Sequence, residues 1–125
     1  MNKPKTIKIF LSDGEPTGTK IVELSNWSGV SYLIPRNRLK ETLQNEANKS
    51  DLNSQCIYFL IGSNEENEKS VYIGEAEEFS KRITQHNKNK DFWNLVMVFT
   101  SKDDNLTKAH IKYLESKVTK EIKLN

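Results

Sequence analysis

Five polar side chains capable of chemistry stand in segments whose other residues are largely apolar: Tyr58, Tyr72, Arg82, His86 and Glu115. Phenol and imidazole groups exchange protons, a guanidinium binds anions through a planar fork of donors, and a carboxylate is an oxygen ligand for a hard metal ion. Buried charges are costly unless they are paired or bind a metal, so this pattern indicates a functional site. A structural interpretation competes with it, since tyrosines suit strands and an arginine stem can cover apolar surface.

The segments that must position these groups alternate between strand and helix character. Two short apolar runs separated by a charged loop predict an antiparallel hairpin that carries both tyrosines. The helical period that follows places Arg82 and His86 on one face, and Glu115 lies beside the apolar stripe of a later helix. The predicted order is strands at 57–61 and 71–74, a helix over 75–88, a strand at 95–99 and a helix from about residue 106.

The first part of the chain is predicted to form a small module of its own. Three apolar runs bounded by turn residues predict strands, and Pro35 can open a helix after them. The polar run 48–51 is rich in turn-forming residues, so it divides the chain into a strand and helix module over 1–50 and a domain over 51–125. The predicted strands cover residues 6–11, 20–24 and 30–34, and the apolar face of the helix contains Leu39, Leu43 and Ala47.

Two tripeptides and two single residues follow one another in consecutive elements: Cys56-Ile57-Tyr58, then Tyr72-Ile73-Gly74, then Arg82 and Glu115. This pattern resembles the GIY-YIG nuclease family over roughly residues 55–122. The resemblance implies an α+β fold in which a small three-stranded antiparallel sheet is flanked by helices. It also implies an endonuclease that hydrolyses phosphodiester bonds with one divalent ion, Mg²⁺ or Mn²⁺.

The resemblance assigns a role to each residue. Tyr58 takes a proton from the attacking water, directly or through the metal, and Tyr72 supports it. Arg82 binds the phosphate and Glu115 is the protein ligand of the metal. His86 is a proton relay or a phosphate contact, with a structural histidine as the alternative. Because a phenol has an ordinary pKa of about 10, Tyr58 needs help from nearby cations to act as a base.

Three features depart from the family pattern. Cys56 replaces the glycine of the first tripeptide. The loop between the tyrosine strands is longer and more acidic than the shortest versions in the family, with Glu65, Glu66 and Glu68. Relatives also carry an asparagine well beyond the metal-binding glutamate, whereas this sequence stops at Asn125. We therefore expect the sequence to be a piece of a longer protein.

The implied partner is nucleic acid, in the first place DNA. Lys81 beside Arg82, and Arg36, Arg38 and Lys40 near the start of the N-terminal helix, are candidate phosphate contacts. A solvated basic face is the other interpretation of the N-terminal cluster. The net charge of the whole chain is only +2, so the total provides no strong electrostatic argument.

The cysteine and histidine content excludes two kinds of stabilising site. One cysteine excludes an intramolecular disulfide, and one thiol with two histidines excludes the usual four-ligand zinc site. No apolar run approaches the roughly 20 residues of a membrane span. We expect a cytoplasmic protein.

Three functions remain open on the sequence: a metal-dependent DNA endonuclease, a non-catalytic nucleic-acid-binding module of a larger protein, and a nuclease that acts on RNA. The first follows most directly from the pattern of Tyr58, Tyr72, Arg82 and Glu115. Nothing in these residues distinguishes a 2′-hydroxyl from its absence.

Overall fold

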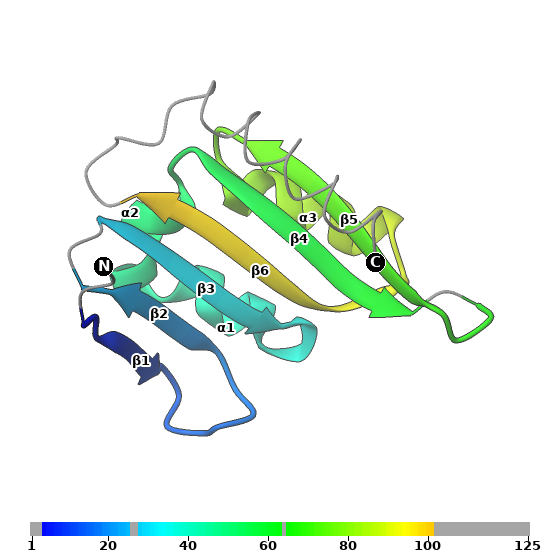
Figure 1. Cartoon of the computed structure of the whole chain (residues 1–125). Helices are drawn as coiled ribbons and strands as arrows, with labels where there is room; N and C mark the ends of the chain where they lie inside the picture. The colour runs from blue at the N-terminus through cyan, green and yellow to red at the C-terminus, as the bar shows by residue number, and fades with distance from the viewer. Residues whose placement is uncertain (1–3, 26–27, 64, 102–125) are drawn as a thin grey trace.

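The chain forms one antiparallel sheet with helices packed on one of its faces in the computed structural model, which describes residues 4–25, 28–63 and 65–101 (Figure 1). The helix predicted from about residue 106, and Glu115 with it, lies outside the described residues. The elements are β1 (Ile7–Leu11), β2 (Lys20–Leu24), β3 (Gly29–Pro35), the 3₁₀ turn η1 (Arg36–Arg38), α1 (Leu39–Gln44), the 3₁₀ turn η2 (Glu46–Asn48), α2 (Lys49–Leu52), β4 (Cys56–Ser63), β5 (Lys69–Ala76), α3 (Phe79–Asn89) and β6 (Trp93–Ser101).

Over the described part of the chain the sheet has six strands in the order β1-β2-β3-β6-β4-β5, so the predicted number of three was wrong. The hairpin of β4 and β5 is confirmed, and β6 pairs with the other edge of β4. The remaining edge of β6 pairs with β3 along its length, from Gly29 opposite Ser101 to Pro35 opposite Leu95. The three N-terminal strands therefore extend the sheet that carries the tyrosines.

The strands alternate between two apolar faces, as the two-residue period of a strand requires. One face packs against the helices and holds Tyr58 and Leu60 of β4 with Tyr32 of β3. The opposite face holds a smaller cluster around Ile57 and Phe59, which are 2% and 8% exposed. Strand β4 is thus buried on both sides, which explains its continuous apolar run.

The predicted N-terminal helix is interrupted. Residues after Pro35 form η1 and then α1, which ends because Asn45 is extended (φ −72°, ψ 119°) and its side chain accepts a hydrogen bond from the Ala47 amide. Leu39 is buried, but Ala47 is exposed, so its place on the apolar face was wrong. Residues 49–52, beside the predicted boundary, form α2.

The helices of the described residues are too short and too polar to cross a membrane.

Candidate active site

Tyr58 and His86 meet at the interface between the sheet and α3. The Tyr58 hydroxyl lies 2.7 Å from His86 Nε2, and the two residues are 1% and 8% exposed. Strand β4 directs Tyr58 toward the helices, and α3 buries Phe79, Ile83 and His86 along one face. The spacing of four and then three residues along that face places an imidazole where an apolar side chain would otherwise pack, within hydrogen-bonding distance of a phenol.

Gly74 provides the space for this contact. It lies opposite Tyr58 in the register of β4 and β5, and a Cβ atom at Gly74 would overlap the Tyr58 ring and its hydroxyl. A glycine is therefore required here by close packing, since nothing larger than hydrogen fits beside the phenol.

Tyr72 completes a triangle of three rings with Tyr58 and His86. Its ring centroid lies 6.4 Å from that of Tyr58 and 5.1 Å from that of His86. Lys90 at the C-terminal end of α3 places its ammonium nitrogen 4.4 Å from the centroid of the Tyr72 ring, within range of a cation–π interaction. Lys90 is a member of the site that the sequence reasoning missed.

The surroundings of His86 favour its neutral form. Burial lowers the pKa of His86 below its ordinary value, and the nearby charges of Lys90 and Arg82 lower it further. A neutral imidazole protonated on Nδ1 has an acceptor lone pair on Nε2, which can receive the proton of the Tyr58 hydroxyl. Tyr58 and His86 thus form a pair able to pass a proton.

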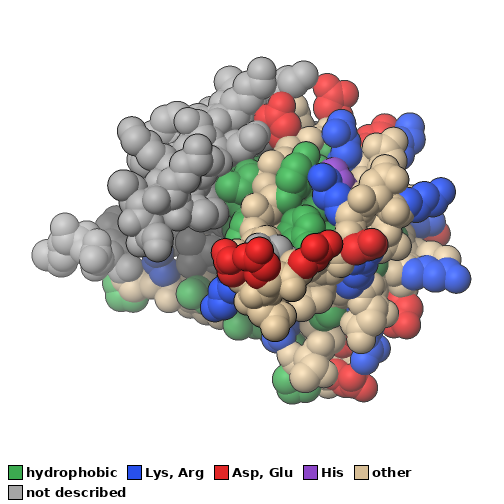
Figure 2. Space-filling view, turned by 90° about the vertical axis from the view of Figure 1, so that its right-hand side faces the viewer, with side chains coloured by type: hydrophobic (Ala, Val, Ile, Leu, Met, Phe, Trp, Pro, Cys, Tyr) green, Lys and Arg blue, Asp and Glu red, His purple; other side chains and the backbone are tan. Residues whose placement is uncertain are grey.

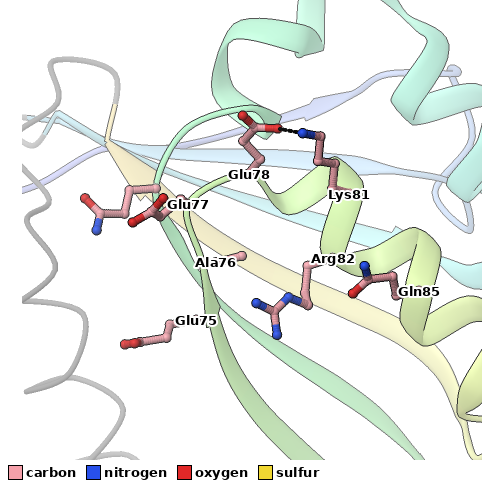
Figure 3. A pocket seen from close by; sticks show the side chains of 8 residues that line it. Glu75, Ala76, Glu77, Glu78, Lys81, Arg82 and Gln85 are labelled. Atoms are coloured by element: carbon pink, nitrogen blue, oxygen red, sulfur yellow. Dashed lines mark ion pairs between the residues drawn. The ribbon is translucent and has the colours of Figure 1, made fainter.

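Arg82 lies one turn before His86 on α3 and is exposed. It lines a hollow of about 480 Å³ with residues of β5 and of the turn that precedes α3. Figure 3 shows its side chain extending from α3 toward β5. Within the described residues, its guanidinium makes no hydrogen bond or ion pair, so its planar fork of donors is available to a ligand.

Comparison with known proteins decides the family. The model of the GIY-YIG catalytic domain matches residues 54–122, more than half of the chain. The chain belongs to the GIY-YIG family. No curated protein and no solved structure matches it. The GIY-YIG domain is a nuclease-type domain, and the match spans both tyrosine strands, α3 and β6.

The structure brings together some, but not all, of the site residues that the sequence predicted. Tyr58, Tyr72 and His86 are in contact through their rings, and Arg82 is close enough to affect the charge state of His86. The hollow beside Arg82 is lined by neither tyrosine among the described residues. The phenol of Tyr58 is enclosed below the surface, whereas Arg82 stands at the surface.

The other two arginines of the chain are engaged within the fold. All five donors of Arg36 bond to α3, to the start of β6 and to the residues between them. Arg38 forms ion pairs with Asp13, Glu15 and Glu41 at 2.8–3.6 Å. The predicted phosphate contacts of Arg36 and Arg38 remain untested, and these bonds weigh against them.

Two lysines among the predicted phosphate contacts are exposed. Lys81 pairs with Glu78 at 3.3 Å (Figure 3), and such a pair on the surface contributes little energy, so Lys81 can exchange Glu78 for another anion. Lys40 is exposed on α1. Figure 2 shows Lys and Arg side chains beside a histidine, with Asp and Glu side chains interspersed around them.

No three His, Cys, Asp or Glu side chains of the described residues lie close enough together to hold a metal ion. Glu115, the predicted ligand, lies outside those residues. Glu75 Oε2 on β5 is buried and has no hydrogen-bond partner among the described residues, but its carboxylate points away from Arg82 (Figure 3). A single carboxylate fits Mg²⁺ or Mn²⁺, because these ions keep several waters and take substrate oxygens as ligands.

Proposed function

We propose that this GIY-YIG domain is a metal-dependent endonuclease that hydrolyses phosphodiester bonds in DNA. The observation that supports it most is the 2.7 Å contact between the Tyr58 hydroxyl and His86 Nε2, beside an Arg82 guanidinium that the described residues leave unpaired. A proton-accepting pair next to an available phosphate-binding group is what hydrolysis of a phosphodiester requires.

Each residue has a distinct part in this proposal. Tyr58 accepts a proton from the attacking water as its own proton passes to neutral His86, which is the more exposed member of the pair. Tyr72 packs against the imidazole through an edge contact between the two rings and so helps to hold it. Arg82 binds the phosphate and stabilises the negative charge that develops in the transition state. An Mg²⁺ or Mn²⁺ ion, when bound through Glu115, supplies Lewis-acid stabilisation of the same charge.

The burial of Tyr58 favours a second candidate. Its side chain is 1% exposed, so the phenol does not reach bulk water in this arrangement. A non-catalytic nucleic-acid-binding module would use Arg82 and the lysines for phosphate contact while Tyr58 and His86 only support the fold. DNA and RNA are separate possibilities for both candidates.

Cleavage by the full chain tests these candidates. Supercoiled plasmid, duplex oligonucleotides and an RNA hairpin are incubated with Mg²⁺ or Mn²⁺, and with EDTA as the metal-free control. Tyr58→Phe removes the hydroxyl and should reduce the rate by about 10²-fold or more, as loss of a general base does. Tyr32→Phe is the matched control, because this buried tyrosine of β3 donates to Asp51 at 2.8 Å and does not touch His86.

Arg82 supplies the second arm of the test. Arg82→Lys keeps the charge but loses the planar fork, and should cost about 10²- to 10³-fold in rate, as loss of a positioned donor does. Equal rates for wild type, Tyr58→Phe and Arg82→Lys would remove both residues from the mechanism. Binding without cleavage under every condition would support the non-catalytic module.

A further inference from the structure

Arg36 connects the N-terminal segment to the end of the helix that carries His86. Its Nε donates to Asn87 Oδ1 at 2.9 Å, and its Nη2 donates to the carbonyls of Asn87 and Lys90 at 3.0 and 3.1 Å. Its Nη1 donates to the carbonyls of Asp91 and Trp93 at 3.2 and 3.0 Å. These bonds use every donor that a guanidinium possesses.

The guanidinium of Arg36 lies at the C-terminal end of α3, where a cation is favourable. The last carbonyls of an α-helix have no amide partner within the helix, and the negative end of its dipole attracts a cation. The guanidinium also lies 4.3 Å from the centroid of the Trp93 ring, which is 1% exposed. The connection between α3 and β6 is therefore held against η1 by one side chain.

The same connection carries the groups that face Tyr72 and Tyr58. The Lys90 amide donates to the His86 carbonyl at 2.9 Å, and the Lys90 ammonium lies over the Tyr72 ring. Asn87, which accepts two of the five bonds, is the next residue after His86. A shift of this connection would move Lys90 directly and His86 with it.

We propose that Arg36 is a positioning residue of the active site: by holding the Asn87 and Lys90 carbonyls, it sets His86 against Tyr58 and Lys90 against Tyr72. The N-terminal segment is then part of the catalytic architecture, although it lies outside the residues that match the family. The kinetic part of this inference rests on the proposed nuclease function, whereas the geometric part does not.

The competing explanation is that Arg36 only caps the end of α3 and stabilises the fold. The pKa of His86 distinguishes this explanation from a positioning role. In the described residues, the titratable groups that surround this imidazole are Tyr58 of β4, Tyr72 of β5, and Arg82 and Lys90 of α3. The pKa of His86 measured by NMR therefore reports whether the imidazole keeps its place. A structural cap would lower the melting temperature and leave this pKa unchanged.

The experiment compares Arg36→Lys with Asn48→Ala in the full chain. Arg36→Lys keeps one charge but cannot make five bonds. Asn48 is buried and donates to the Thr42 carbonyl at 3.1 Å. Among the described residues its side chain bonds within the N-terminal segment and not to α3, so Asn48→Ala controls for lost stability. The readouts are the melting temperature, the His86 pKa, and single-turnover cleavage of plasmid DNA with Mg²⁺ at several protein concentrations.

For Arg36→Lys we expect the His86 pKa to rise toward about 6.5, its ordinary value. The maximal single-turnover rate should fall by about 10- to 100-fold, with half-saturation within about twofold of wild type, because misplacement affects the reacting geometry more than binding. Asn87→Ala, which removes one of the five bonds, should show a smaller change in the same direction. Asn48→Ala should keep the wild-type pKa and rate.

Two results would overturn the proposal. One is a wild-type His86 pKa in both Arg36→Lys and Asn87→Ala. The other is an equal loss of rate in Arg36→Lys and Asn48→Ala at equal loss of melting temperature. If the wild type cleaves nothing, the nuclease proposal fails, and the pKa measurements still decide whether Arg36 positions His86.

Discussion

At the scale of single residues, the pair of Tyr58 and His86 explains why a glycine occupies position 74. We predict that Gly74→Ala pushes the Tyr58 ring away from His86, because the added methyl would overlap the phenol. Overpacking of this kind costs about 1–3 kcal/mol of unfolding free energy. Urea unfolding and cleavage rates should both show the change. Val71→Thr on the same strand, where the side chain is 42% exposed, should leave both unchanged.

His86 also predicts a pH dependence. Since burial and two cations lower its pKa in the folded protein, it binds fewer protons than in the unfolded chain when the pH falls below about 6.5. Its contribution to stability is therefore complete above about pH 6.5 and is lost as the pH falls through the lowered pKa. Cleavage should fall over the same acidic range, where neutral His86 is depleted.

Thermal melts and cleavage rates between pH 5 and 8 measure this dependence, with His86→Gln as the reference. The variant should cleave more slowly at neutral pH and should lack the acidic loss of rate that wild type shows. A variant whose melting temperature and rate follow the wild-type pH profile would show that another group titrates.

The Cys56 thiol is buried, which makes it unreactive toward thiol reagents in the folded protein. Burial raises its pKa to about 12, and its side chain is 0% exposed, so almost no thiolate forms at neutral pH and no reagent reaches it. We predict that a maleimide does not label the native protein at pH 7.5 and labels it fully in 6 M guanidinium chloride. Rapid labelling of the native chain would show that β4 opens at this position.

At the scale of elements, local pattern predicted the strands well and their partners only in part. The apolar runs at β4 and β5, separated by a charged loop, could pair in only one simple way, and this hairpin is confirmed. The pairing of β3 with β6 joins segments far apart in the sequence, and no local period carries that information. The predicted sheet therefore lacked three strands.

The site shows the same limit. The helical period of α3 predicted one face for Arg82 and His86, but the structure buries His86 and leaves Arg82 exposed. The period also could not show which of the three arginines would lack a partner among the described residues. Arg36 and Arg38 were predicted as phosphate contacts from their charge and their place near a helix start, while the structure uses them for hydrogen bonds and ion pairs. Whether an arginine is available to a ligand depends on side-chain partners in distant elements, and these partners cannot be identified from a single sequence.

At the scale of the whole molecule, the six-stranded sheet bears on the predicted division at residue 50. A fragment of residues 51–125 would lack β3, so β6 would expose an unpaired edge and apolar residues would lose their partners. It would also lack Arg36, which bonds to the end of α3. We predict that this fragment melts well below the full chain or aggregates, because edge pairing and core contacts are lost together.

A longer fragment provides the control for this truncation. The fragment of residues 28–125 keeps β3, η1 and Arg36 and lacks the strands β1 and β2. In β1 the side chains of Ile7, Ile9 and Phe10 are 64%, 56% and 57% exposed. This fragment should keep dispersed NMR signals, a single melting transition and the wild-type pKa of His86. If residues 51–125 alone match the full chain in these three measurements, the nuclease-type domain folds independently, and the N-terminal segment is an attachment that merely shares its sheet.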